Sequence, residues 1–233
     1  VNDGRPEVAE YLAARQWPEF IEILNLPENR RFAGANNAGW RQLIERHPEI
    51  RFLGTINDDT VPRKGWLDAM AEALERYPRA ALAMPVMGTN LGPLHTKKNF
   101  ATWEFRDGAG VVMAPRSNNI RTDEFVSAVN GYCFLAARTA LEEAGFFDEG
   151  FRNSCEDLDL GISLLRAGLR MVTCHRAWVF HYGKMSRKIK GADTNVTASR
   201  ELLLRKWGAE LSKYNALDGE GFLKELPPLP EGN

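Results

Sequence analysis

The sequence has no long apolar run and few cysteines. No stretch of its 233 residues approaches the roughly 20 consecutive apolar residues that cross a bilayer, and no signal peptide is visible at its start. We therefore expect no transmembrane segment, which leaves peripheral contact as the route to a membrane. The three cysteines, Cys133, Cys155 and Cys174, are odd in number and widely spaced, which fits neither a disulfide framework nor a C-x-x-C metal knuckle. We expect reduced thiols and a cytoplasmic location, including the inner face of the membrane.

An excess of one charge is also missing. Lys and Arg number 30 against 31 Asp and Glu, so the sequence lacks the large positive electrostatic field that is typical of a general nucleic-acid binder. A small molecule or a glycan is the expected partner. What the chain does have is 44% apolar residues, which is enough for one principal core at this length. We predict one domain over residues 1–210 and a tail over residues 211–233.

Short apolar runs alternate with segments of helical periodicity along most of the chain. This alternation predicts parallel strand pairing in a layered α/β sheet, whose ligands collect at the carboxyl ends of strands. Periodicity fades between residues 85 and 123, where we expect loops, an antiparallel excursion and the determinants of acceptor specificity. The expected strands are 20–24, 51–56, 80–84, 125–136 and 170–180, and the expected helices are 7–17, 34–46, 66–77, 139–144, 157–167 and 197–207.

Two adjacent carboxylates follow one of these strands. Asp58 and Asp59 come directly after the apolar run 51–56, and neighbouring carboxylates repel unless a cation or solvent screens them. Oxygen ligands suit Mg²⁺ or Mn²⁺, and a site with few protein ligands leaves positions for substrate phosphates. An Asp-rich turn before Pro62 explains the same residues without a metal.

A second acidic group, Glu156, Asp157 and Asp159, opens the helix predicted at 157–167. The helix dipole favours carboxylates at this end, and capping accounts for at least one of them. Three carboxylates exceed what capping requires. One that faces a cleft can accept the proton of an incoming hydroxyl, as a general base does.

The third candidate is His181, which comes directly after the strand predicted at 170–180. A lone histidine at such a place is commonly a packing or surface residue, but its neutral imidazole is a competent metal ligand. Lys184, Arg187 and Lys188 follow. They are explained as a solvated basic loop, or as a loop that folds over a diphosphate.

The order of seven short motifs resembles the family 2 glycosyltransferases, which have the GT-A fold, and especially their bacterial rhamnosyl- and galactofuranosyl-transferase-like members. Each motif alone is weak, but the seven in this order and at these separations are specific. The resemblance covers residues 1–186, and its motifs lie at residues 1–4, 29–39, 57–59, 130–133, 145–149, 156–159 and 177–181.

The resemblance implies a Rossmann-like layered mixed sheet flanked by helices, a nucleoside-diphosphate sugar as donor and a divalent cation, Mn²⁺ or Mg²⁺, as cofactor. It further implies roles for single residues. On the nucleotide side, Asp3 would lie near the donor base, Asn37 would help to shape the nucleotide pocket, and Asp58 would approach the ribose or the metal. Asp59 and His181 would bind the metal, and Lys184 or Arg187 would support the diphosphate. Asp157 would be the catalytic base, with Glu156 next in line for that role.

Two features depart from the family pattern. The glycine that usually precedes Phe32 is Arg31, which would alter the nucleotide edge or place a cation near phosphate. The strand and helix that normally come before Asp3 are absent from the sequence, which starts at Val1 like a fragment of a longer chain.

These expectations combine into an inverting transfer in one displacement, in which Asp157 removes the proton of an acceptor hydroxyl on a glycan, a lipid-linked sugar or another molecule. Synthesis of bacterial cell-surface polysaccharide is the expected setting. Two alternatives remain open from the residues. One is a noncatalytic sugar-nucleotide or glycan-binding domain on the same fold. The other is a nucleotidyltransferase, which would want a Gly-rich phosphate loop near the first strand.

Overall fold

The computed structural model describes residues 1–88, 102–107, 110–115, 123–126, 129–152, 154–182 and 196–211. Within them, the main sheet has the strand order β3-β9-β5-β10-β4, and β8 also pairs with β10. These strands are β3 (Phe52–Ile56), β4 (Thr60–Pro62), β5 (Ala80–Gly88), β8 (Glu124–Val126), β9 (Cys133–Ala137) and β10 (Arg170–His181).

The main sheet is mixed, as the family resemblance implied, rather than parallel throughout, as the alternation of elements implied. β5 and β10 pair in parallel, whereas β3–β9, β5–β9, β10–β4 and β10–β8 are antiparallel. Two smaller sheets complete the strands. β1 (Asn2–Asp3) and β2 (Asn25–Leu26) pair in parallel, and β6 (Thr102–Asp107) and β7 (Gly110–Pro115) form the expected antiparallel excursion.

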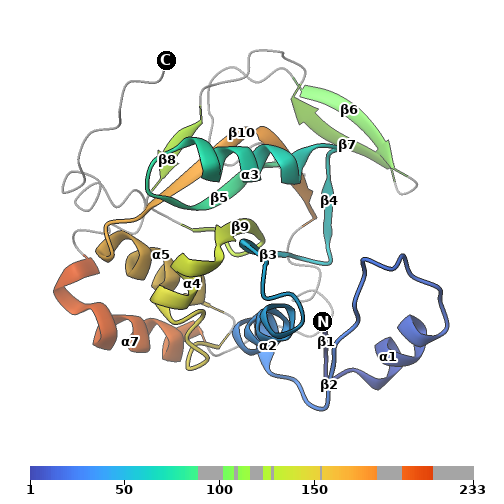
Figure 1. Ribbon diagram of the computed structural model, residues 1–233, viewed down its shortest axis with the longest axis horizontal. Helices are drawn as coiled ribbons and strands as arrows, with labels where there is room; N and C mark the ends of the chain where they lie inside the picture. The colour runs from blue at the N-terminus through green and yellow to red at the C-terminus, as the bar shows by residue number, and fades with distance from the viewer. Residues whose placement is uncertain are drawn as a thin grey trace.

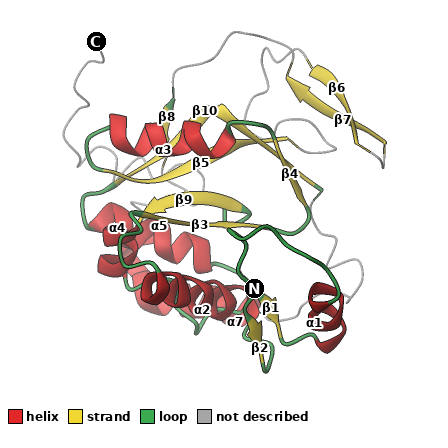
Figure 2. Cartoon of the chain, turned by 45° about the vertical axis from the view of Figure 1, so that its right-hand side comes forward, coloured by secondary structure: helices red, strands yellow, loops and turns green. Residues whose placement is uncertain are grey.

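Helices cover both faces of the main sheet (Figures 1 and 2). α3 (Trp66–Arg76) lies on one face and buries Ala69, Met70, Ala73 and Leu74, which recur on one side of the helix. The opposite face carries α2 (Arg31–Arg46), α4 (Arg138–Ala144), α5 (Glu156–Arg166) and α7 (Val196–Trp207), which pack in one apolar cluster around Phe134, Leu160 and Trp207. A short 3-10 turn, Gly208–Glu210, follows α7.

The arm between β1 and β2 departs most from the sequence prediction. α1 (Pro6–Ala13) is shorter than the helix predicted over 7–17, and it buries none of its residues. The strand predicted over 20–24 is wrong, because β-pairing begins only at Asn25 and Phe20 is 86% exposed. An apolar run forms a strand only where a partner edge accepts it, and here the partner, β1, is two residues long.

Most other elements lie where the sequence placed them. The run predicted as one strand over 125–136 is two strands, β8 and β9, with a turn around Asn130 and Gly131 between them. This turn precedes β9, and β9 is antiparallel to β3, so the start of β9 lies beside the end of β3. The topology therefore brings the turn at 130–132 next to the residues that follow β3.

Candidate functional site

Asp59 and His181 face each other at the same end of the main sheet. The Asp59 Oδ1 and His181 Nε2 atoms are 3.0 Å apart, and each side chain is 17% exposed. The pairing of β10 with β4 sets this contact, because His181 lies opposite Thr60 and the backbone N–H of Tyr182 donates to the Asp59 carbonyl oxygen. The structure thus joins two residues that are 122 positions apart in the sequence.

Neighbouring residues for which no metal role was predicted hold the Asp59–His181 pair in place. The Asn57 amide nitrogen lies 3.4 Å from His181 Nε2, and Thr60 Oγ1 donates to the Asn57 carbonyl oxygen. The Tyr132 ring stacks on the imidazole, with ring centroids 5.0 Å apart and planes inclined by 12°. Burial raises the pKa of the Tyr132 phenol, which therefore stays protonated and donates to the Pro85 carbonyl oxygen.

The turn at 130–132 connects this pair to Asp157. On one side, the Asn57 N–H donates to the Tyr132 carbonyl oxygen at 2.8 Å. On the other side, the Gly131 N–H donates to Asp157 Oδ2 at 3.1 Å. A Cβ at Gly131 would lie 3.5 Å from the Asp157 Cβ, so the turn and the start of α5 are in close contact. Asp59, His181 and Asp157 therefore border one turn.

Asp157 is the second residue of α5 and is held by two backbone donors. Besides Gly131, the Leu158 N–H donates to Asp157 Oδ1 at 2.9 Å. Burial raises the pKa of Asp157, and the hydrogen bonds from Gly131 and Leu158 oppose this shift. A carboxylate whose pKa moves toward neutrality is a better proton acceptor than an ordinary surface aspartate. The neighbouring Glu156 is 8% exposed.

The third acidic residue of α5, Asp159, has a structural role. It is 2% exposed and accepts hydrogen bonds from Lys206 Nζ at 2.9 Å and from Trp207 Nε1 at 2.7 Å. Lys206 also donates to Asp148. These contacts tie α7 to the helix that carries Asp157. The acidic start of α5 therefore contains both an anchor and a candidate base.

Asp58 and Asp59 differ in their surroundings although they are adjacent. Asp58 is exposed, whereas Asp59 is largely covered by the contact with His181. An exposed carboxylate beside a covered one suits the predicted division of labour, with Asp58 toward a ligand and Asp59 toward a cation. Both roles stay predictions, and the predicted phosphate contacts of Lys184 and Arg187 lie outside the described residues.

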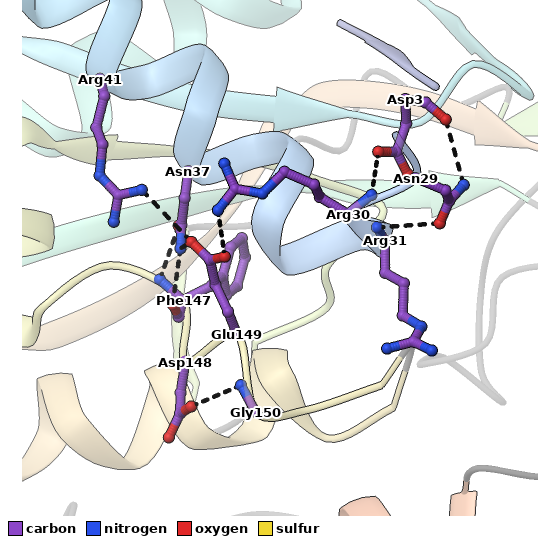
Figure 3. Close-up of polar contacts among 10 residues, drawn as sticks. All are labelled: Asp3, Asn29, Arg30, Arg31, Asn37, Arg41, Phe147, Asp148, Glu149 and Gly150. Carbon is purple, nitrogen blue, oxygen red and sulfur yellow. Dashed lines mark hydrogen bonds and ion pairs between the residues drawn. The ribbon is translucent and has the colours of Figure 1, made fainter. Parts of the chain in front are cut away.

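Asp3 organises the turn before α2 (Figure 3). Its Oδ1 accepts the Arg30 N–H at 2.6 Å, and its carbonyl oxygen accepts from the Asn29 amide at 3.3 Å. Two residues after Arg30, the Phe32 ring packs against Gly131, where an added Cβ would lie 3.4 Å from the ring. Through Phe32, the segment that binds Asp3 thus contacts the turn that binds Asp157.

Asn37 is 1% exposed and serves the loop that precedes α5. Its amide donates to the Phe147 carbonyl oxygen and to Glu149 Oε1, and its Oδ1 accepts the Phe147 N–H (Figure 3). These contacts make Asn37 a positioning residue for the loop, and its predicted share in a nucleotide pocket remains a prediction. The sequence motif at 145–149 was recognised, but the role of Glu149 as the partner of Arg30, Arg41 and Asn37 was missed.

The donor set around His181 fits a small oxygen-seeking cation. The Asp59 Oδ1 and His181 Nε2 atoms are 3.0 Å apart, close enough for both to contact one divalent ion. Carboxylate and imidazole suit Mn²⁺, with the Asn57 amide beside them. Among the described residues there is no cluster of three or more His, Cys, Asp or Glu.

Among the described helices, none is long and apolar enough to cross a membrane.

Comparison with known proteins agrees with the predicted fold and family. Residues 1–144 match the family model described as Glycosyl transferase family 2. The chain superposes on GalNAc-T7, solved with UDP, GalNAc and Mn²⁺, with a TM-score of 0.60 at 12% identity, over 95% of this chain and 45% of that one. At this identity the likeness concerns the fold alone, and it confirms the GT-A architecture.

Two curated relatives are similar over most of this chain. N-acetylglucosaminyl-diphospho-decaprenol L-rhamnosyltransferase of Mycobacterium tuberculosis is 29% identical over 199 residues, which are 78% of this chain and 63% of that protein. The O-antigen biosynthesis protein RfbC of Myxococcus xanthus is 28% identical over 196 residues, which are 80% of this chain and 15% of that protein. The chain thus spans less than two thirds of either relative. Because the family model matches 144 of its 233 residues, the chain belongs to glycosyl transferase family 2.

Proposed function

We propose that this chain is the catalytic part of an inverting glycosyltransferase that moves a sugar from a nucleoside diphosphate to an acceptor hydroxyl in cell-surface glycan synthesis. One observation carries the proposal. The turn at 130–132 contacts the Asp59–His181 pair through Asn57 and Tyr132, and it binds Asp157 through the Gly131 N–H. A candidate base and a candidate cation site thus border the same short segment, as a displacement at one sugar carbon requires.

Asp157 is the proposed base. In a single displacement, the acceptor hydroxyl loses its proton as its oxygen bonds to the anomeric carbon, while the bond from that carbon to the diphosphate breaks. The backbone donors at Gly131 and Leu158 fix the orientation of the carboxylate, and burial raises its affinity for the proton. Glu156, one residue earlier, is the second candidate for this role.

Asp59 and His181 are the proposed ligands of a divalent cation. When bound there, Mn²⁺ or Mg²⁺ would neutralise the negative charge of the diphosphate group. The stacked Tyr132 ring and the Asn57 amide restrict the imidazole to one orientation. Lys184 and Arg187 are proposed to support the same phosphates.

The nucleotide is proposed to lie on the side of Asp3, which holds the turn before α2. Asp58, exposed at the end of β3, would approach the ribose or the cation, and Asn37 would act through the Phe147–Glu149 loop. The name of the mycobacterial relative gives its acceptor as a sugar on a diphospho-polyprenol. We propose a lipid-linked or glycan hydroxyl as acceptor here, and work at the cytoplasmic face of a membrane.

A noncatalytic binding domain is the less supported alternative, since a binding module has no need of a buried carboxylate beside its ligand. A direct assay separates the two. The chain is incubated with Mn²⁺ or Mg²⁺, a panel of nucleotide sugars and a short-chain prenyl-diphosphate N-acetylglucosamine, and release of the nucleoside diphosphate is followed. NMR of the product then reports the anomeric configuration. Binding of a nucleotide sugar with neither transfer nor hydrolysis would support the binding domain and refute the enzyme.

A further inference from the structure

We infer that Arg31 is a phosphate-binding residue of this site. The inference rests on the proposed function, because it names a further contact to the substrates. Arg31 is the first residue of α2, and its backbone has a φ of +61°, a left-handed conformation that side chains other than glycine rarely adopt. Such strain persists where the surrounding structure or a function compensates for it.

The position of Arg31 lies between the two parts of the proposed site. The residue before it, Arg30, donates its N–H to Asp3, and the residue after it, Phe32, packs against Gly131 beside Asp157. A ligand that extends from Asp3 toward Asp157 therefore passes the Arg31 position.

In the part of the chain that the structure describes, the Arg31 guanidinium differs from those of Arg30, Arg41 and Arg46 in having no acidic partner. Arg30 pairs with Glu149 at 2.7 Å, Arg41 pairs with the same carboxylate, and Arg46 pairs with Glu22. Within the described residues, the Arg31 guanidinium makes neither a hydrogen bond nor an ion pair, and only its backbone N–H is used, by Asn29. Figure 3 shows its side chain extending away from the Arg30–Glu149 pair.

Arg31 is half-buried, and its guanidinium group is permanently charged and carries five N–H donors in one plane. Such a group suits a phosphate. Two substrates of the proposed reaction carry phosphate: the donor nucleotide, and an acceptor whose sugar is attached through a diphosphate to a lipid. Both present the same chemistry to Arg31. The contact is noncovalent, and Arg31 donates hydrogen bonds without losing a proton.

The test compares Arg31→Asn with Arg31→Lys and with a matched control, Arg79→Asn. Asn accepts the left-handed backbone and removes the charge, whereas Lys keeps the charge. Arg79 also has a positive φ, of 65°, but it lies exposed directly before β5, with its side chain against Gly168. Because Asn is tolerated at positive φ, the thermal midpoint of neither Asn variant should fall.

Affinity for UDP, GDP and dTDP is measured by calorimetry with Mn²⁺, with the matching nucleosides for comparison, and the KM is measured for donor and for the prenyl-diphosphate acceptor. Arg31→Asn should weaken at least one phosphate-bearing substrate about tenfold or more and leave nucleoside binding unchanged. Arg31→Lys should retain most of the wild-type affinity for that substrate, and Arg79→Asn should bind it as tightly as the wild type does. A weaker donor identifies the nucleotide diphosphate as the ligand, and a higher acceptor KM identifies the lipid diphosphate.

Unchanged affinity of Arg31→Asn for both substrates would overturn the inference, as would an equal loss in Arg79→Asn. A wild-type chain that binds nucleoside diphosphate but transfers no sugar would refute the proposed function, while the Arg31→Asn titration would still decide the phosphate contact. A wild-type chain that binds no phosphate-bearing substrate would refute both.

Discussion

The two sides of the proposed site are built differently. The reaction side rests on β3, β9 and β10, whose residues Leu53, Phe134 and Val179 are almost completely buried. The nucleotide side rests on β1 and β2, which are two residues long, and on the arm with α1, which buries none of its residues. Core packing therefore positions the reacting groups, whereas a few polar contacts position the groups near Asp3.

The carboxylates of the two sides show the same contrast. Burial raises the pKa of Asp157 on the reaction side. On the nucleotide side, the hydrogen bond from Asn37 lowers the pKa of Glu149, burial opposes this shift, and the Arg30 and Arg41 guanidinium groups lower the pKa further. One carboxylate is thus adapted to accept a proton and the other to stay charged.

Replacing Asp157 by Asn tests the reaction side most strongly. Loss of a general base should lower kcat by about 10²–10⁴-fold, while affinity for nucleoside diphosphate should change less than twofold. Steady-state kinetics and calorimetry give the two numbers. Asp68→Asn, an exposed acidic residue of α3, is the control and should leave both unchanged. Parallel loss of binding and turnover in the Asp157 variant would mean that this residue is not the base.

Replacing one phenylalanine on each side tests the difference in packing between the main sheet and the arm. Phe134 of β9 is 1% exposed, and Phe134→Ala should cost about 3–5 kcal/mol of the free energy of unfolding because it leaves a cavity in the core. Phe20 of the arm is 86% exposed, and Phe20→Ala should change that free energy by less than about 0.5 kcal/mol. Denaturant titration measures both. Similar losses in the two variants would show that the arm is packed against something in solution.

Asp59→Asn should act through the cation. The variant keeps the size of the side chain but loses a charge beside His181, so the Mn²⁺-dependent part of nucleotide affinity should fall by about 10–100-fold. EDTA should reduce wild-type binding to the level of the variant and have little further effect on the variant itself. If EDTA left wild-type binding intact, the cation site would have to be abandoned.

The smallest expected effect concerns pH. The lowered pKa of Glu149 contributes stability that is present above its unfolded value of 4.5 and is lost as the pH falls through the lowered folded value. Because the side chain is 35% exposed and solvent screens its ion pairs, Glu149→Gln should cost less than about 1 kcal/mol near neutral pH.

The contribution of Asp157 to the free energy of unfolding should change with pH in the opposite direction. Its folded pKa lies above the unfolded value of 3.8, so the wild type loses stability as the pH rises through the raised value. Unfolding free energies of the Glu149→Gln and Asp157→Asn variants from pH 3 to 8 compare the two directly. Parallel curves relative to wild type would contradict the contrast between the two sides.

Much of this arrangement was predictable from the sequence, because long elements carry their own signals. The strand before Asp58, the acidic helix start at Glu156 and the strand that ends at His181 all lie where hydrophobic pattern and family motifs placed them. The strand predicted at 20–24 failed because a short strand depends on its partner edge rather than on its own residues. The split of the run at 125–136 was missed although Asn130-Gly131 is a turn signal.

Other features follow only from the tertiary structure. The stacking of Tyr132 on His181 and the burial of Asn37 under the Phe147–Glu149 loop join segments far apart in the sequence. No local sequence pattern predicts such contacts. The glycine that the family usually has at this position hinted at a left-handed backbone for Arg31, but only the structure shows that conformation.

Crystals grown with Mn²⁺ and a nucleoside diphosphate would test the central claim most directly, by anomalous diffraction at the manganese edge. A peak within coordination distance of both Asp59 and His181, with the diphosphate against it and Asp157 across the 130–132 turn, is the predicted result. A manganese peak elsewhere on the chain, with Asp59 and His181 still bonded only to each other, would contradict the account.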